Sequence, residues 1–164
     1  MTRTAIVMRH AKSSWDDPWR EDHERPLNKR GRRSAQVLGD WLRMRGHLPD
    51  QTLCSSAART RETFEGLNLK TEIEFIGALY HAGARTLLSH LQKASGKSVL
   101  LIAHNPGIAD FAEQLVNTPP DHDRFYDYPT GATLVVTLDI SDWSDVTWRS
   151  GTVKDFVIPR ALLS

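Results

Sequence analysis

The stretch Ala5-Ile6-Val7-Met8-Arg9-His10-Ala11-Lys12 joins an apolar run directly to a cation and an imidazole. A short apolar run of this kind is typical of a buried β-strand, so we expect a strand over residues 5–8. Arg9 and His10 then lie where that strand ends. Because ligands of open α/β sheets bind beyond the carboxyl ends of the strands, this position favours an anion site. Taken alone, the pair is more typical of a solvated arginine and a structural loop histidine, so further residues are needed to support an anion site.

Length and composition indicate an ordinary globular chain. The 164 residues are enough for one domain with a real core, and we expect a single domain over residues 1–164. Hydrophobic residues make up 40% and charged residues 25%, which argues against disorder. The net charge of +1 gives no overall field that would attract nucleic acid or an acidic membrane, so neither is an expected partner. Any anion site must therefore be a local cluster.

The N-terminal apolar run bears on the cellular location of the protein, and the cysteine content bears on disulfides and metal sites. The run before Arg9 is too short for a signal-peptide core or a membrane span, so we expect a cytoplasmic protein. Cys54 is the only cysteine, which excludes an internal disulfide and any multi-thiolate metal site.

Strand and helix patterns alternate along most of the chain. Further strands are predicted over residues 51–54, 71–76 and 98–103, and helices over residues 29–45, 84–94 and 108–116. The run over residues 98–103 is the most apolar and should be a central parallel strand. Residues 132–138 and 153–158 predict a late antiparallel pair. The expected fold class is α/β, with three α/β/α layers around a mainly parallel central sheet.

The helix over residues 29–45 carries clear end signals. Asn28 can cap its start, and Gly46 follows its end. Its first turns are basic, which suits the helix dipole poorly, and we interpret this run as a solvated face. The run consists of Lys29, Arg30, Arg32 and Arg33.

A second arginine lies at the start of the helix predicted after residue 54. Ser55 or Ser56 can act as its N-cap, and Arg59 lies within about the first turn. Free backbone N–H groups and a guanidinium together can bind an anion the size of phosphate. The alternative is an exposed helical arginine.

A second histidine repeats the opening arrangement, because His104-Asn105-Pro106-Gly107 follows the strand over residues 98–103. Arg9, His10, Arg59 and His104 therefore all follow strands and can meet in one crevice. Two guanidinium groups suit the oxygens of a phosphoryl group. One histidine can accept the phosphoryl group on nitrogen while the other stabilises charge during transfer. The arginines should lower the pKa of the acceptor and keep it neutral.

Three motifs in order resemble those of the histidine phosphatase superfamily, also called phosphoglycerate mutase-like. They are Met8–Lys12, Ser55–Thr63 and Ala103–Gly107, and the stretch Asp22–Leu27 followed by Gly31 is similar to the SixA-like phosphohistidine phosphatase branch. The resemblance implies the phosphoglycerate mutase-like fold and a phosphatase that needs no metal or other cofactor. It implies that His10 accepts the phosphoryl group, Arg9 and Arg59 bind phosphate, and His104 lies against the transferred group.

The resemblance also leaves one role open. Many members of the superfamily carry a glutamate general acid after the third strand, but Ala78-Leu79-Tyr80-His81-Ala82 contains no carboxylate. His81, Asp22 and Glu24 are candidate proton donors, although each is more typical of a structural or solvated residue. A missing acid favours a phosphohistidine substrate, because a protonated phosphoimidazole leaves as a neutral ring.

Substrate contacts are predicted around this centre. The resemblance implies Arg25 as a further substrate contact, and Trp15 and His81 are additional candidates. Trp15 and Trp19 can present an apolar platform to a partner surface, or can pack back onto the fold.

The functional hypothesis is a phosphatase that acts on a phosphorylated protein, such as a phosphohistidine protein, through phospho-His10. A broad phosphatase of small phosphate esters and a non-catalytic phosphate-binding module are alternatives. A cysteine phosphatase fits less well, because four residues separate Cys54 from Arg59 where those enzymes have five, and a strand-end cysteine is typically a buried thiol. A metal hydrolase fits poorly too, because the cations would repel a divalent ion.

Overall fold

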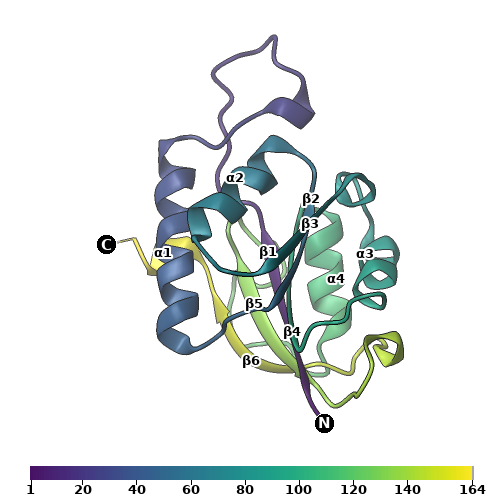
Figure 1. The fold of residues 1–164 in the computed structure, drawn as a ribbon. Coiled ribbons are helices and arrows are strands. Elements are labelled where there is room, and N and C mark those ends of the chain that lie inside the picture. Colours follow the sequence, from purple (N-terminus) through teal and green to yellow (C-terminus); the bar gives the residue numbers. More distant parts are fainter. Residues whose placement is uncertain (164) are drawn as a thin grey trace.

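The computed structural model describes residues 1–163 and contains one sheet of six strands (Figure 1). The strands are β1 (Arg3–Arg9), β2 (Gln51–Ser55), β3 (Glu72–Ile76), β4 (Ser98–Ala103), β5 (Thr133–Leu138) and β6 (Thr152–Val157). Their order across the sheet is β3-β2-β4-β1-β5-β6. The first four in this order pair in parallel, whereas β5 is antiparallel to both β1 and β6. The predicted α/β class with a late antiparallel pair is confirmed.

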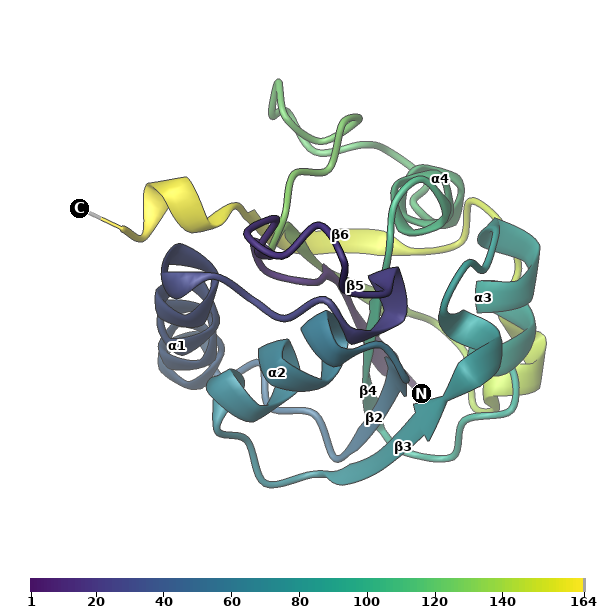
Figure 2. The same ribbon diagram turned by 90° about the horizontal axis from the view of Figure 1, so that it is seen from above.

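Helices cover both faces of the sheet and complete the three layers. They are α1 (Lys29–Arg45), α2 (Ala58–Leu67), α3 (Ala84–Leu91) and α4 (Gly107–Leu115). Short 3-10 turns also occur, η1 (Asp22–Glu24), η2 (Gly77–Leu79), η3 (Trp143–Asp145) and η4 (Pro159–Ala161). Figure 2 shows α1 and α2 on one side of the sheet, and α3 and α4 on the other. Across residues 1–163, no helix combines the length and the apolar character needed to cross a membrane.

The apolar run of β1 supplies both layers of the core. Ala5 and Val7 pack in the cluster that includes α3 and α4, whereas Ile6 and Met8 pack in the cluster that includes α1 and α2. Side chains alternate between the two faces of a strand, so a strand covered on both faces must be apolar throughout. This explains why residues 5–8 of β1 are continuously hydrophobic up to Arg9.

The central position of β4 determines where the polar residues meet. β4 pairs with β1 on one side and β2 on the other, with Ala103 opposite Arg9 and Ile102 opposite Cys54. These three strands run parallel, so their carboxyl ends share one edge of the sheet. The residues that follow them are therefore neighbours.

The end signals of α1 are confirmed. The Asn28 side chain accepts a hydrogen bond from the Gly31 N–H at 2.8 Å, and Gly46 follows the helix with a φ of 72°. Gly31 also permits a close approach, because a Cβ atom at this position would lie 2.0 Å from the carbonyl oxygen of Lys12. The loop after β1 therefore packs directly on the start of α1.

The predicted cap of α2 is wrong. Ala57 occupies the N-cap position and makes no side-chain capping bond. Ser55 and Ser56 are engaged elsewhere, because the Ser55 hydroxyl bonds to Nε2 of His104 and the Ser56 hydroxyl to Nε2 of His23.

The helix α3 is shorter than its apolar pattern predicts. It ends at Leu91, and the backbone of residues 93 and 94 makes bonds to residues three positions earlier, as in a tight turn. The turn brings the chain toward β4, which begins at Ser98.

Candidate active site

The residues after β1, β2 and β4 line one cavity of about 310 Å³. Its wall includes the four polar residues singled out from the sequence, Arg9, His10, Arg59 and His104. The imidazole centroids of His10 and His104 lie 5.3 Å apart. The structure therefore brings together side chains that are up to 95 positions apart in the sequence, as the strand pattern predicts.

His10 is held as a neutral ring with a defined tautomer. It is 5% exposed, and its Nδ1 atom lies 2.7 Å from the Ala11 carbonyl oxygen. A carbonyl only accepts hydrogen bonds, so Nδ1 carries the proton and Nε2 keeps its lone pair. The pKa of His10 is lowered well below its ordinary value, mainly by burial and then by the positive charge of neighbouring groups. The arginines contribute as expected, but burial is the larger cause.

His104 is also neutral but is held differently. Its Nε2 atom lies 2.8 Å from the Ser55 hydroxyl. Burial, followed by the nearby Arg59 charge, lowers the pKa of His104 to about 3. Its Nδ1 atom is buried without a hydrogen-bond partner within residues 1–163, an arrangement that is unfavourable unless a ligand supplies one.

Asp22 positions two of the arginines. Its carboxylate accepts a hydrogen bond from Nη2 of Arg59 at 3.1 Å and from Nη2 of Arg25 at 3.2 Å, and its backbone carbonyl accepts another from Nη1 of Arg59 at 2.8 Å. The Tyr80 hydroxyl donates to the same carboxylate. These contacts, with that of Tyr80 the largest, hold the pKa of Asp22 well below its usual range. Asp22 therefore orients cations and is a poor proton donor.

Glu24, a second candidate proton donor, contacts a neighbour in the same turn. Its carboxylate lies 3.1 Å from Nδ1 of His23, and Glu24 is exposed. Among residues 1–163, those that line the cavity around His10 do not include Glu24.

His81, the third candidate, packs against the ring of Tyr80. The ring centroids of His81 and Tyr80 are 3.9 Å apart, and Tyr80 in turn packs edge-on against His104 at 5.5 Å. The positive form of His81 contributes to the lowered pKa of His104. The Tyr80 ring therefore packs against both His81 and His104.

Arg25 and Trp15 form the rim of the cavity. Arg25 is buried, donates to the Ser13 hydroxyl, and places its guanidinium 3.7 Å from the centroid of the Trp15 ring. Such stacking is a cation–π interaction that orients both groups. Trp15 is 76% exposed and Trp19 is 92% exposed, so the interpretation that both pack back onto the fold is wrong.

Two residues beyond those predicted from the sequence fix the position of Arg9. The carbonyl of Tyr128 accepts hydrogen bonds from Nη1 of Arg9 at 3.2 Å and from Nδ2 of Asn105 at 3.1 Å. Tyr128 has a φ of 47°, an unfavourable conformation for a bulky residue. In the sequence, the position of Asn105 directly after His104 indicates that it lies near the site. No sequence pattern connects Tyr128 with Arg9.

Cys54 is unsuited to catalysis. Its side chain is fully buried in the cluster under α1 and α2, and burial raises the pKa of its thiol to about 12. A reactive cysteine requires a thiolate near neutral pH. The cysteine phosphatase alternative is therefore wrong.

Metal-binding side chains are also dispersed. Considering residues 1–163 only, no three His, Cys, Asp or Glu side chains are grouped so that they could hold a metal ion.

Comparison with known proteins gives consistent likenesses. The family model of the histidine phosphatase superfamily (branch 1) matches residues 5–80. The structure of SixA from Nakamurella multipartitia is similar to this one with a TM-score of 0.84. The two sequences are 28% identical, and the match covers 97% of each chain. The protein histidine phosphatase SixA complexed with tungstate has 25% identity and a TM-score of 0.77, over 97% of this chain and 99% of the other. An uncharacterised protein of Mycobacterium leprae is 29% identical over 93% of this chain and all of its own length.

Proposed function

This chain belongs to the histidine phosphatase superfamily and has the phosphoglycerate mutase-like fold, and from this premise we propose that it is a phosphohistidine phosphatase of the SixA-like branch. In this proposal a cytoplasmic, single-domain enzyme removes phosphoryl groups from phosphoproteins. The observation that carries the proposal is the convergence of two buried, neutral imidazoles and two guanidinium groups on one cavity, formed by His10, His104, Arg9 and Arg59.

In the first step, His10 attacks the substrate phosphorus. The lone pair of Nε2 forms the P–N bond while the bond from phosphorus to the leaving group breaks in line, and the leaving group departs with the bonding electrons. Arg9 and Arg59 bind the phosphoryl oxygens, whose negative charge they balance. The hydrogen bond from Nδ1 to Ala11 fixes the ring so that Nε2 is the attacking atom.

In the second step, water attacks phosphorus on phospho-His10. The new P–O bond forms, the P–N bond breaks, and its electrons return to Nε2 of His10. The attacking water releases one proton to the solvent, and the products are inorganic phosphate and the neutral imidazole. His104, at a centroid distance of 5.3 Å from His10, contacts the transferred group in both steps.

The ionised state of Asp22 supports phosphohistidine as the substrate. Asp22 is ionised because it pairs with Arg59 and Arg25 and accepts from Tyr80, and so it holds no proton to give. An alkoxide leaving group needs a strong acid, whereas phosphohistidine can be protonated on its second ring nitrogen and leaves as a neutral imidazole. Arg25 and Trp15 at the rim are the proposed contacts for the rest of the substrate, and His81 acts through Tyr80.

A substrate panel tests the proposal. Wild type and His10→Ala are compared on a phosphohistidine protein, a phosphotyrosine peptide and small sugar phosphates. We expect phosphohistidine to give the highest kcat/KM, and His10→Ala to lose turnover. Equal turnover of sugar phosphates would instead indicate a broad phosphomonoesterase, and the absence of both phosphate release and an acid-labile phosphoenzyme would indicate a binding module.

A further inference from the structure

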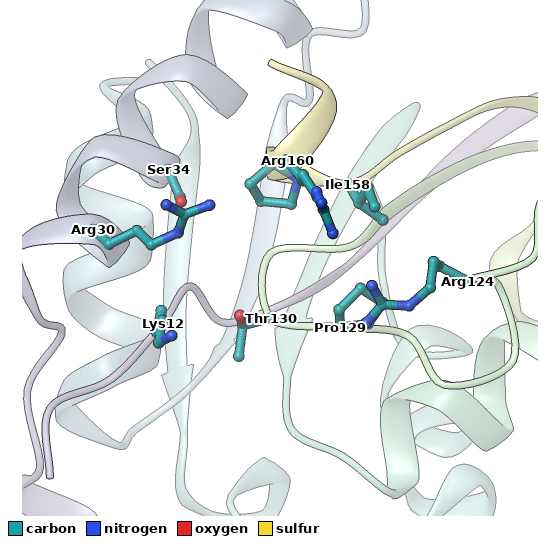
Figure 3. A pocket seen from close by; sticks show the side chains of 9 residues that line it. Lys12, Arg30, Ser34, Arg124, Pro129, Thr130, Ile158 and Arg160 are labelled. Atoms are coloured by element: carbon teal, nitrogen blue, oxygen red, sulfur yellow. The ribbon is translucent and has the colours of Figure 1, made fainter. Parts of the chain in front are cut away.

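A second cavity lies beside the candidate active site, and Figure 3 shows its polar side chains. Lys12 and Thr130 line both cavities, so the two spaces adjoin. The cationic residues of the second cavity come from four separate segments of the chain. They are Lys12 after β1, Arg30 in the first turn of α1, Arg124 in the loop between α4 and β5, and Arg160 in η4.

Within residues 1–163, a carboxylate pairs with one of these four cations and leaves the other three unbalanced. Arg124 donates from Nε to Asp127 at 2.9 Å. No ion pair within residues 1–163 joins Lys12, Arg30 or Arg160 to a carboxylate. Like charges brought together from distant segments repel one another. Since the whole chain has a net charge of only +1, this cluster is a local feature that favours an anion.

Arg30 is poorly placed for the stability of α1. The first turn of this helix contains no acidic residue, and the helix dipole disfavours cations there. The basic run at the start of α1 is exposed along its whole length, as the sequence predicts for a solvated face. Arg30 and Arg33 are both exposed, but Arg30 lines the second cavity together with the Ser34 hydroxyl, whereas Arg33 lies outside its lining. Recognition of an anion explains the position of Arg30 better than helix stability does.

We propose that this second cavity is an anion subsite, which binds a second negatively charged group of the substrate while the first phosphoryl group is transferred to His10. The inference rests on the proposed phosphatase function and narrows its substrate class. The second group is a carboxylate or phosphate held by several guanidinium groups, as in oxyanion recognition elsewhere. It belongs either to acidic residues that flank the phosphorylated side chain of a polypeptide or to a bisphosphorylated small molecule.

The test uses two matched pairs of substrates. One pair consists of phosphohistidine peptides that differ only in flanking Glu or Gln residues, and the other of a sugar monophosphate and the corresponding bisphosphate. An exposed ion pair contributes up to about fivefold, and the proposed subsite binds its anion with several cations. Wild type should therefore prefer the acidic member of one pair by roughly tenfold in kcat/KM at low salt. The preference should shrink at high ionic strength, because salt screens exposed charges.

Three variants locate the preference. The double substitution Arg30→Gln with Arg160→Gln should bring the ratio close to one, while Arg30→Lys with Arg160→Lys should keep most of it. Arg33→Gln removes the same charge from the same helix outside the cavity and should leave the ratio at its wild-type value. Binding of each peptide to His10→Ala gives the same comparison without turnover.

The outcomes separate the two proposals. A preference for the acidic peptide that the Arg30→Gln and Arg160→Gln protein loses supports the subsite and a polypeptide substrate. A preference for the bisphosphate that is lost in the same way supports the subsite and a small molecule. Equal values within both pairs, or a preference that the double variant retains, overturn the subsite. If no phosphorylated compound is turned over, the phosphatase proposal fails, and the binding ratios still decide the subsite.

Discussion

Two histidine-bearing turns face each other across the cavity, and they are held in different ways. The turn after β1 fixes His10 through the backbone carbonyl of Ala11, whereas the turn after β4 fixes His104 through the side chain of Ser55. Both rings are buried and neutral. The difference indicates separate roles. A backbone acceptor dictates which nitrogen of His10 carries a proton, while the Ser55 hydroxyl can donate or accept and allows His104 to adjust as charge develops.

The largest expected effect separates the two histidines directly. His10→Ala should reduce kcat by at least about 10⁴-fold and form no phosphoenzyme, because the nucleophile is absent. His104→Ala should reduce kcat by about 10²- to 10³-fold and still form phospho-His10, because only charge stabilisation is lost. Rapid quench of the acid-labile phosphoenzyme measures both. Phosphoenzyme on the His10→Ala protein would contradict the assignment.

The lowered pKa of both rings predicts a shared response to acid. In the folded protein the imidazoles stay neutral as the pH falls through the ordinary value of about 6.5, but in the unfolded chain they bind protons. Stability is therefore complete above pH 6.5 and declines as the pH falls toward the folded pKa. For His104, with a folded pKa of about 3, the loss at pH 5 is roughly 2 kcal/mol.

Urea unfolding at pH 7.5 and pH 5 measures this loss, and NMR titration of the imidazole C–H signals identifies the groups. The His104→Ala protein, compared with wild type, should lose less stability over the same interval. Titration of either ring in the folded protein near pH 6.5 would contradict the burial argument.

A smaller effect should follow from Ser55→Ala. The change removes the hydrogen-bond partner of His104 and leaves the Ala11 carbonyl of His10 in place. We expect kcat to fall about three- to tenfold, the usual contribution of one buried hydrogen bond. Steady-state kinetics test this, and Ser55→Thr, which keeps the hydroxyl, should retain more activity. A loss as large as that of His10→Ala would show that the two turns are not independent.

The smallest effect is expected one residue earlier in β2. Cys54→Ser alters a buried thiol whose pKa is raised to about 12 and which contacts neither histidine through a hydrogen bond within the described chain. Activity should stay within about twofold of wild type, while stability should fall by about 1 kcal/mol because a polar hydroxyl replaces a buried thiol. Activity assays and thermal unfolding check the two parts. Loss of activity in a folded protein would revive a role for the thiol.

Much of this organisation follows from local sequence patterns. The alternation of strand and helix predicted the sheet, and the position of Arg9, His10, Arg59 and His104 after strands predicted that they share one edge. These inferences depend on residues near each other in the chain, such as Asn28 and Gly31 at the start of α1. The error at the start of α2 arose because Ser55 has a long-range partner that outcompetes the local cap.

The sequence alone therefore determined the class of fold, the edge of the sheet where the polar residues gather, and the resemblance to a family. Only the tertiary structure decided how those residues are held. Asp22 pairs with Arg59 across 37 positions and Tyr128 supports Arg9 across 119. The physical reason is that propensity and periodicity act over a few residues, whereas burial, hydrogen bonds and charge pairing depend on which distant segments the sheet places side by side.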